Sequence, residues 1–206
     1  MPGQTNSAYF LWERFKNGDN DAFYSIYDQY FDSLYNYGLH FTPDENLIKD
    51  CIHDLFLDLY KYRKRLSKTD NILYYLLRSL RRLIHKELTK RNMLLTDEQL
   101  MFQNDTPVMA IEDVIIADEI QKEHFKALTD VMKSLSKRQQ EGLSLKFEHN
   151  LSYTEIATTL DISVESARTI IYRALKDLRK ALKKNQTFNS LLLFFVFKNL
   201  IHTHKI

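Results

Sequence analysis

Apolar residues recur at every third or fourth position through long stretches of this chain, which is the spacing of an amphipathic helix. Only four Gly and three Pro are spread over its 206 residues, and no pair of alternating segments suggests a strand hairpin. Hydrophobic side chains make up 44% of the chain, which is enough for packed cores. The sequence therefore predicts an all-α protein of one or two small domains.

The N-terminal half has the pattern of four helices. A short helix is expected over 9–16, and the next apolar repeat runs over 23–35 after a break at 18–21. A third helix follows the break at 42–44, because a proline disfavours helical backbone in the residue before it, and a basic loop at 63–71 leads to the fourth. The inner faces of the last two helices are predicted to carry Leu47, Ile48, Cys51, Ile52, Leu55, Phe56 and Leu59, and Ile72, Leu76, Leu80, Leu83 and Ile84. Such helices predict a compact bundle.

A helix-turn-helix is predicted in the segment Leu151–Lys184. Its first helix ends at Asp161, a residue type that tolerates left-handed backbone, and Ser163 is a good N-cap for a second helix. An inward stripe is expected from Ala167, Ile170, Ile171, Ala174, Leu175 and Leu178. The outward residues are Ser166, Arg168, Thr169, Tyr172, Arg173 and Lys176. That outer face has the chemistry of a helix that reads a DNA groove, although similar helix pairs occur in bundles that bind no nucleic acid.

Charge is strongly segregated, although the net charge is only +2. The stretch 61–91 has eleven basic residues against two acidic ones, and 164–184 has seven against two. Between them, 96–121 has seven acidic residues and no Lys or Arg. An acidic connector thus separates two basic helical regions, whose binding to a phosphate backbone would release counterions and weaken with salt.

Several classes of protein are excluded by what the sequence lacks. Cys51 is the single cysteine, so no intrachain disulfide or Cys-based zinc site is possible, and a reducing cytoplasm fits best. The first ten residues do not read as a signal peptide, and the apolar run 191–197 is too short to span a membrane. We expect that run to pack on a domain or bind a partner. Phosphate-binding, zinc-protease and hydrolase motifs are missing, so we expect no enzyme, no metal and no cofactor.

Four segments and a connector, taken in order, resemble the extracytoplasmic-function sigma factors of bacteria over about residues 9–184. They are WERFKNGDNDAFYSIYDQYFDSLYNYG, DCIHDLFLDLYKYRKRL, YYLLRSLRRLIHKEL, the acidic connector, and SLSKRQQEGLSLKFEHNLSYTEIATTLDISVESARTIIYRALKDLRKAL. The resemblance implies two small helical domains: a sigma region 2 type bundle at 8–92 and a sigma region 4 type helix-turn-helix at 122–184. An acidic linker at 93–121 joins them, and an apolar tail occupies 185–206.

By this resemblance the chain binds core RNA polymerase in the cytoplasm and directs promoter-specific initiation by recognising and helping to melt promoter DNA. The implied polymerase contacts are Asp50, His53, Asp54 and Phe56, an acidic edge around an apolar anchor. The implied minus-ten contacts are Lys68, Asn71, Tyr74, Tyr75, Arg78, Arg81 and Arg82, and the minus-thirty-five contacts are the six outward residues of 166–176.

Some alternatives stay open on the sequence alone. Phe56 also has core spacing, and Tyr74 or Tyr75 is either buried or free to stack on unpaired bases. The chain could be an autonomous helix-turn-helix regulator that binds DNA without polymerase, or an adaptor whose apolar tail binds its partner. Whether an anti-sigma protein binds the chain is also left open.

Overall fold

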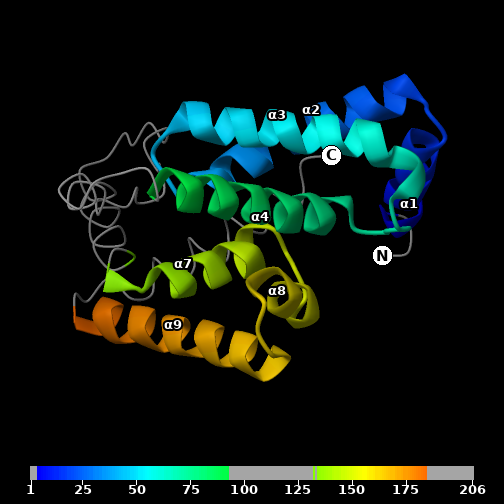
Figure 1. Cartoon of the computed structure of the whole chain (residues 1–206). Helices are drawn as coiled ribbons and strands as arrows, with labels where there is room; N and C mark the ends of the chain where they lie inside the picture. The colour runs from blue at the N-terminus through cyan, green and yellow to red at the C-terminus, as the bar shows by residue number, and fades with distance from the viewer. Residues whose placement is uncertain (1–3, 93–131, 133, 185–206) are drawn as a thin grey trace, which may run out of the picture. The chain divides into compact units, whose positions relative to one another are not determined.

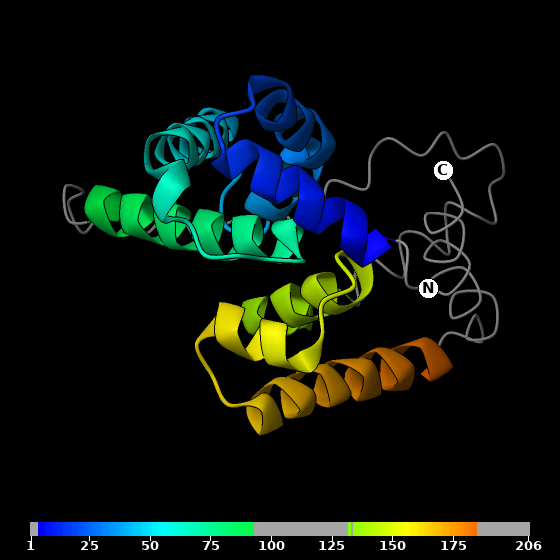
Figure 2. The same ribbon diagram turned by 90° about the vertical axis from the view of Figure 1, so that its right-hand side faces the viewer.

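The computed structural model describes residues 4–92, 132 and 134–184, and its described residues form two compact units (Figures 1 and 2). Within these residues every regular element is a helix and none is a strand. The all-α prediction is confirmed. The predicted acidic linker and apolar tail lie outside the described residues, and the predicted domain boundaries stay a prediction.

In the first unit, residues 4–92 form a bundle of four α-helices, α1 (Gln4–Lys16), α2 (Asn20–Gly38), α3 (Glu45–Tyr62) and α4 (Ile72–Asn92). A short 3-10 turn, η1 (Arg63–Arg65), follows α3 directly. Figure 1 shows α3 and α4 side by side and running in opposite directions, and each of them also packs against α2. The four predicted helices are therefore present, and α1 begins earlier than expected, because its first turn lacks the apolar spacing that marks the rest.

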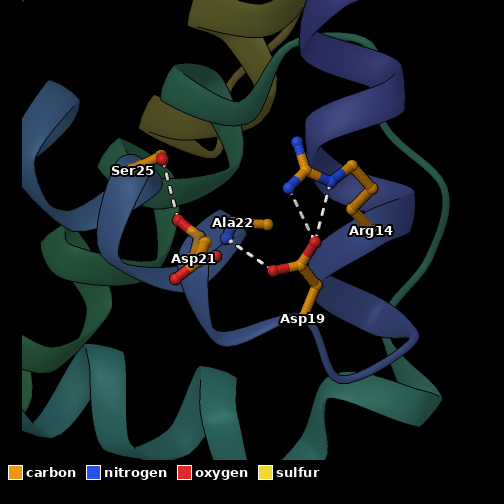
Figure 3. A network of polar contacts seen from close by, with 5 residues as sticks. All are labelled: Arg14, Asp19, Asp21, Ala22 and Ser25. Carbon is orange, nitrogen blue, oxygen red and sulfur yellow. Dashed lines mark hydrogen bonds and ion pairs between the residues drawn. The ribbon is translucent and has the colours of Figure 1, made fainter.

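Capping side chains fix where these helices begin. Asp19 accepts a hydrogen bond from the backbone N–H of Ala22 at 3.1 Å, and its other oxygen pairs with Arg14 of α1 at 2.7 Å (Figure 3). The Ala22 bond and the Arg14 guanidinium hold the pKa of Asp19 below its usual value. Gly18, with φ +95°, supplies the left-handed residue that this tight connection needs. The Gly18 turn, the Asp19 cap and the Arg14 pair thus join the end of α1 to the start of α2.

The core of this unit lies between the apolar faces of all four helices. Every residue predicted on the inner faces of α3 and α4 is buried except Leu83, which is half-buried. Trp12 and Phe15 of α1 close the core and are 0% and 1% exposed. At one helix crossing a Cβ added to Gly38 would lie 2.5 Å from Cγ2 of Ile48, so only glycine permits this approach.

The described residues of the second unit form three helices and one π-helical turn. These are α7 (Lys137–Leu143), η3 (Ser144–Glu148), α8 (Tyr153–Leu160) and α9 (Val164–Lys184), and α9 packs against both α7 and α8. In Figure 1, α9 runs alongside α7 in the opposite direction. A capping box begins each of the two short helices, because Ser and its partner three residues on satisfy each other's backbone N–H groups.

The predicted turn of the helix-turn-helix is confirmed in its details. Asp161 ends α8 in left-handed backbone with φ 55° and ψ 55°, and its N–H donates to the carbonyl oxygen of Ala157. The Ser163 hydroxyl accepts a hydrogen bond from the N–H of Ser166 at 3.1 Å and so caps α9. One part of the predicted stripe is wrong: Leu175 is 42% exposed. It lies about 100° around the helix from buried Ala174, beyond the surface that α7 and α8 cover.

Candidate polymerase and nucleic-acid interfaces

The outer face of α3 carries an acidic stripe. Asp50, His53 and Asp54 are all exposed, and they share one face because residues three and four apart are neighbours on a helix. Leu57 extends this stripe by one turn with 55% of its surface exposed. Two carboxylates beside an exposed apolar side chain suit a partner surface of complementary charge with a central apolar anchor.

Phe56 is not part of this exposed stripe: it has the core position that the sequence left open, and its role as a polymerase contact stays a prediction. The side chain is 3% exposed, and its ring centroid lies 4.8 Å from that of Tyr27 and 5.9 Å from that of Phe23. The apolar residue of the acidic stripe is the next one along, Leu57, which sequence reasoning missed. The signal was available, because Leu57 follows His53 and Asp50 at i+4 and i+7.

The loop before α4 is stabilised by short-range hydrogen bonds. Asn71 accepts a hydrogen bond from the N–H of Tyr74 at 3.0 Å, and its own N–H donates to the Thr69 hydroxyl at 3.1 Å. Asn71 is half-buried and supports the first turn of α4, whereas Lys68 in the same loop is exposed. The loop therefore combines a hydrogen-bonded backbone with the exposed cation of Lys68.

On α4 the remaining predicted residues lie between core and surface. Tyr74, Tyr75, Arg78 and Arg81 are half-buried, and Arg82 is exposed. The Nε atom of Arg78 is buried without a hydrogen-bond partner within the described residues. Because α4 buries its apolar stripe and leaves these cations on the other side, it offers aromatic rings and positive charge along one surface.

A groove of about 310 Å³ opens beside that surface, between α3, the loop and α4. Its lining residues are Leu55, Asp58, Leu59, Tyr62, Leu66, Tyr75, Ser79, Arg82 and Leu83. Of the predicted minus-ten residues, Tyr75 and Arg82 line it. Sequence reasoning missed Asp58, Tyr62 and Ser79, whose shared position depends on the pairing of α3 with α4. The groove combines two aromatic rings with a carboxylate, a hydroxyl and a guanidinium. The rings suit the stacking face of a nucleobase, and the three polar groups suit its hydrogen-bonding edge.

The outer face of α9 is arranged as predicted. Ser166, Arg168, Thr169, Tyr172, Arg173 and Lys176 are all exposed, with Tyr172 at 67%. The guanidinium of Arg168 lies 5.7 Å from the ring centroid of Tyr153 at the start of α8, and 4.0 Å from a carboxylate oxygen of Glu165. The second helix of a helix-turn-helix with such a face fits the major groove of DNA.

Other kinds of site find little support in the part of the chain that the structure describes. No group of three or more His, Cys, Asp or Glu side chains there is placed to hold a metal ion. Burial raises the pKa of the Cys51 thiol to about 11, with Glu87, Asp54 and Asp50 adding to the effect, so the thiol stays protonated and unreactive. None of the described helices has the length and apolar character required to cross a membrane.

Two family models match the chain, one on each unit. The model of Sigma-70 region 2 covers residues 26–93, and that of Sigma-70, region 4 covers residues 131–180. Their order along the chain is that of the bundle and the helix-turn-helix. The chain is thus a two-unit helical protein with both regions of a sigma-70 type protein.

Known proteins resemble the chain over both units. The ECF RNA polymerase sigma factor BldN of Streptomyces coelicolor is 25% identical over 181 residues, which is 84% of this chain, and the chain spans 64% of the length of that relative. The structure of CnrH in complex with the cytosolic domain of CnrY is 15% identical, with a TM-score of 0.56, 86% of this chain covered and 97% of that chain. The sigma factor RpoE of Bartonella quintana, in complex with the anti-sigma factor NepR, is 16% identical, with a TM-score of 0.60 and coverage of 78% and 96%.

These two structures have the same fold as this chain. The two family models and the relative confirm the resemblance drawn from the sequence. The chain belongs to the sigma factors of the extracytoplasmic-function type. Sigma factors are in general not enzymes.

Proposed function

We propose that this chain is a promoter-specificity subunit: it binds core RNA polymerase in the cytoplasm and directs initiation by recognising and helping to melt promoter DNA. The observation that carries the proposal is the order of a region 2 and a region 4 along one chain, each with an exposed surface of the required chemistry. The chemistry of RNA synthesis belongs to the polymerase, and this chain supplies binding energy and strand separation.

The minus-thirty-five element is assigned to the outer face of α9. Arg168 and Arg173 lie five residues apart on that face, and each can donate two parallel hydrogen bonds to a guanine in the major groove. Ser166, Thr169 and Tyr172 lie between and beside them and supply shorter polar contacts. Lys176, further along the helix, is placed for a phosphate.

The minus-ten element is assigned to the groove and the surface beside it. Melting exposes bases that a duplex hides, and a hollow with aromatic walls holds such a base better than a flat helix face. Tyr62 and Tyr75 supply the stacking walls, and Asp58 supplies an acceptor for an exocyclic amine. Lys68, Arg78 and Arg81 are assigned to the phosphates of the same strand.

Core polymerase is assigned to the acidic stripe of α3, with Asp50, His53, Asp54 and Leu57 as its contacts. This surface is opposite in charge to the DNA-facing ones, so it favours a basic partner over DNA. We include an anti-sigma protein among the partners, since the Bartonella quintana relative was solved with one.

Run-off transcription tests the proposal directly. Core polymerase from the source organism is given a genomic fragment library, with and without the chain, and the start sites are sequenced. We expect starts downstream of a shared two-part motif only when the chain is present, and their loss with the Arg168→Ala/Arg173→Ala double variant. Arg138→Ala, which removes an exposed cation of α7, is the matched control and should keep the starts.

Two results would contradict the proposal. If no chain-dependent start appears while the chain alone shifts specific DNA fragments, it is an autonomous regulator. If it neither shifts DNA nor supports transcription but is retained by a protein partner through its apolar tail, it is an adaptor.

A further inference from the structure

Trp12 lies where α1 meets the loop that borders the groove. Its side chain is 0% exposed, and its indole Nε1–H donates to the backbone carbonyl oxygen of Ser67 at 2.9 Å. A buried indole N–H needs an acceptor, and this one takes it from a loop 55 residues further along the chain. The bond therefore ties the loop to α1 by a contact that does not depend on the side chain at position 67.

A second contact of Trp12 is with a residue of α4 that lines the groove. The Trp12 ring lies 5.2 Å from that of Tyr75, centroid to centroid, at an interplanar angle of 56°. Tyr75 lines the groove, and so does Leu66, the residue directly before Ser67. One side chain thus contacts both the loop and α4 at the points where each forms the groove, although Trp12 is not itself one of the lining residues.

The rest of the loop has mainly local support. Its other hydrogen bonds include those of Leu66 with η1, of Thr69 with Asn71, and of Asn71 with the first turn of α4, all between residues close in sequence. Local bonds shape a loop but do not fix its distance from a neighbouring helix. Ordering a loop costs backbone entropy, and a tether formed during folding meets that cost before any ligand arrives.

We propose that Trp12 is a positioning residue for single-strand recognition. From α1 it holds Leu66 and Tyr75 at the spacing that an unpaired nucleobase needs, without touching the DNA. The inference rests on the proposed function, because it assigns the groove to the minus-ten strand. It adds α1, which lies outside the region 2 match at residues 26–93, to the machinery of strand recognition.

The deciding measurement is base discrimination, since general destabilisation lowers binding of every base alike. Polymerase carrying the chain is titrated with single-stranded oligonucleotides of a minus-ten element found by run-off transcription, with each base substituted in turn. Trp12→Phe keeps an apolar ring and removes the N–H donor. We expect it to lower discrimination at one position of the element by about threefold to tenfold, the effect of one hydrogen bond. Affinity for polymerase should stay at the wild-type value.

Tyr37→Leu is the matched control. Tyr37 is a buried aromatic of α2, 0% exposed, and its ring contacts that of Phe41 at 5.1 Å between centroids. This variant should lose stability and keep wild-type discrimination. The inference is overturned if Trp12→Phe discriminates like wild type, or if Tyr37→Leu loses discrimination equally. If the wild-type chain discriminates no base at all, the proposed function fails, which is a different result.

A second measurement applies even if Trp12→Phe does not fold. Trp12 is the single tryptophan of the chain, so its fluorescence reports on this junction alone. In the intact free chain, the minus-ten oligonucleotide should shift or quench that emission, and a scrambled oligonucleotide of equal length should not. Equal emission with both oligonucleotides at saturating binding overturns the inference.

Discussion

The groove between α3 and α4 and the outer face of α9 are both assigned to DNA, but they are built differently. The α9 face comes from a single helix, and its six side chains stand exposed on one convex surface. The groove takes its walls from two helices and a loop, and its two rings are the exposed Tyr62 and the half-buried Tyr75. On the α9 face each side chain can contact the DNA separately. The groove can hold a base only when its walls keep their spacing. The two regions should therefore respond differently to substitution.

The largest expected effect is on the stability of the first unit, where a core residue and an exposed residue adjoin in α3. Phe56→Ala should lower the free energy of unfolding by about 3–5 kcal/mol, because it leaves a cavity among aromatic rings. Leu57→Ala should change it by less than about 0.5 kcal/mol, because this side chain is exposed. Urea unfolding followed by Trp12 fluorescence measures both, and equal losses for the two variants would contradict the placement of Phe56.

The Leu57 variant also tests the acidic stripe of α3. Leu57→Ala and Asp54→Arg should both weaken binding to core polymerase while the chain stays folded. Normal polymerase affinity in both folded variants would remove this stripe from the interface.

Separate contacts on α9 should give additive losses. Arg168→Ala and Arg173→Ala should each weaken binding to the minus-thirty-five element by about 1–3 kcal/mol if the side chain pairs with a base. The double variant should lose the sum to within about 0.5 kcal/mol, since the two residues share no partner. Quantitative binding of the polymerase complex to promoter fragments at fixed salt measures this. A large departure from additivity would mean that the α9 face also acts as one unit.

The groove should show the opposite behaviour. Tyr62→Ala and Tyr75→Ala each remove one of the two aromatic rings that line the groove, so the double variant should lose clearly less than the sum of the single losses. The coupling expected for residues that share a partner is about 0.5–3 kcal/mol. A double-mutant cycle on binding of the single-stranded minus-ten element measures it, and the Arg168/Arg173 cycle is its control. If the losses of the two groove variants are strictly additive, the groove and the α9 face do not differ in the way proposed here.

The smallest effect concerns a helix cap in the first unit. The Leu47 backbone N–H, first, and Arg91, second, hold the pKa of Asp44 below its usual value, through bonds of 3.0 and 2.6 Å. A lowered folded-state pKa adds stability above the unfolded value, near 3.8, and this stability is lost as the pH falls through the folded value. Asp44→Asn keeps a capping oxygen but loses the charge.

We therefore expect Asp44→Asn to be less stable than wild type at neutral pH by a few tenths of a kcal/mol, since the Arg91 pair is partly exposed. The difference should shrink as the pH falls below about 4. Urea unfolding at several pH values measures this. A difference that stays constant down to acid pH would mean that the charge of Asp44 does not contribute.

Much of the fold could be predicted, because its signals are local. The left-handed turn at Asp161 and the Ser163 cap follow from residue type and a helical repeat on either side. The exposed face of α9 was predictable for the same reason: one helix lies on one side of a small core, so the apolar stripe alone defines the opposite face. Leu175 is the exception, because the width of the covered stripe depends on its neighbours α7 and α8.

The site in the first unit was less predictable, because its residues come from several elements. Phe56 and Leu57 are adjacent in sequence and both apolar, and only the packing of α2 on α3 decides that the first is buried and the second exposed. Likewise Asp58, Tyr62 and Ser79 have no shared sequence pattern that marks them as a group. They meet at one hollow because α3 and α4 pair in opposite directions.

The sequence by itself determined the all-helical class, the helix-turn-helix, the segregation of charge and the family, because periodicity, capping residues and motif order are properties of local sequence. The tertiary structure alone decided which apolar side chain of α3 is exposed, where the groove opens, and that Trp12 of α1 holds the loop beside it. These three features depend on contacts between residues far apart in the chain. Helix packing brings those residues together, and no local sequence pattern indicates that it does.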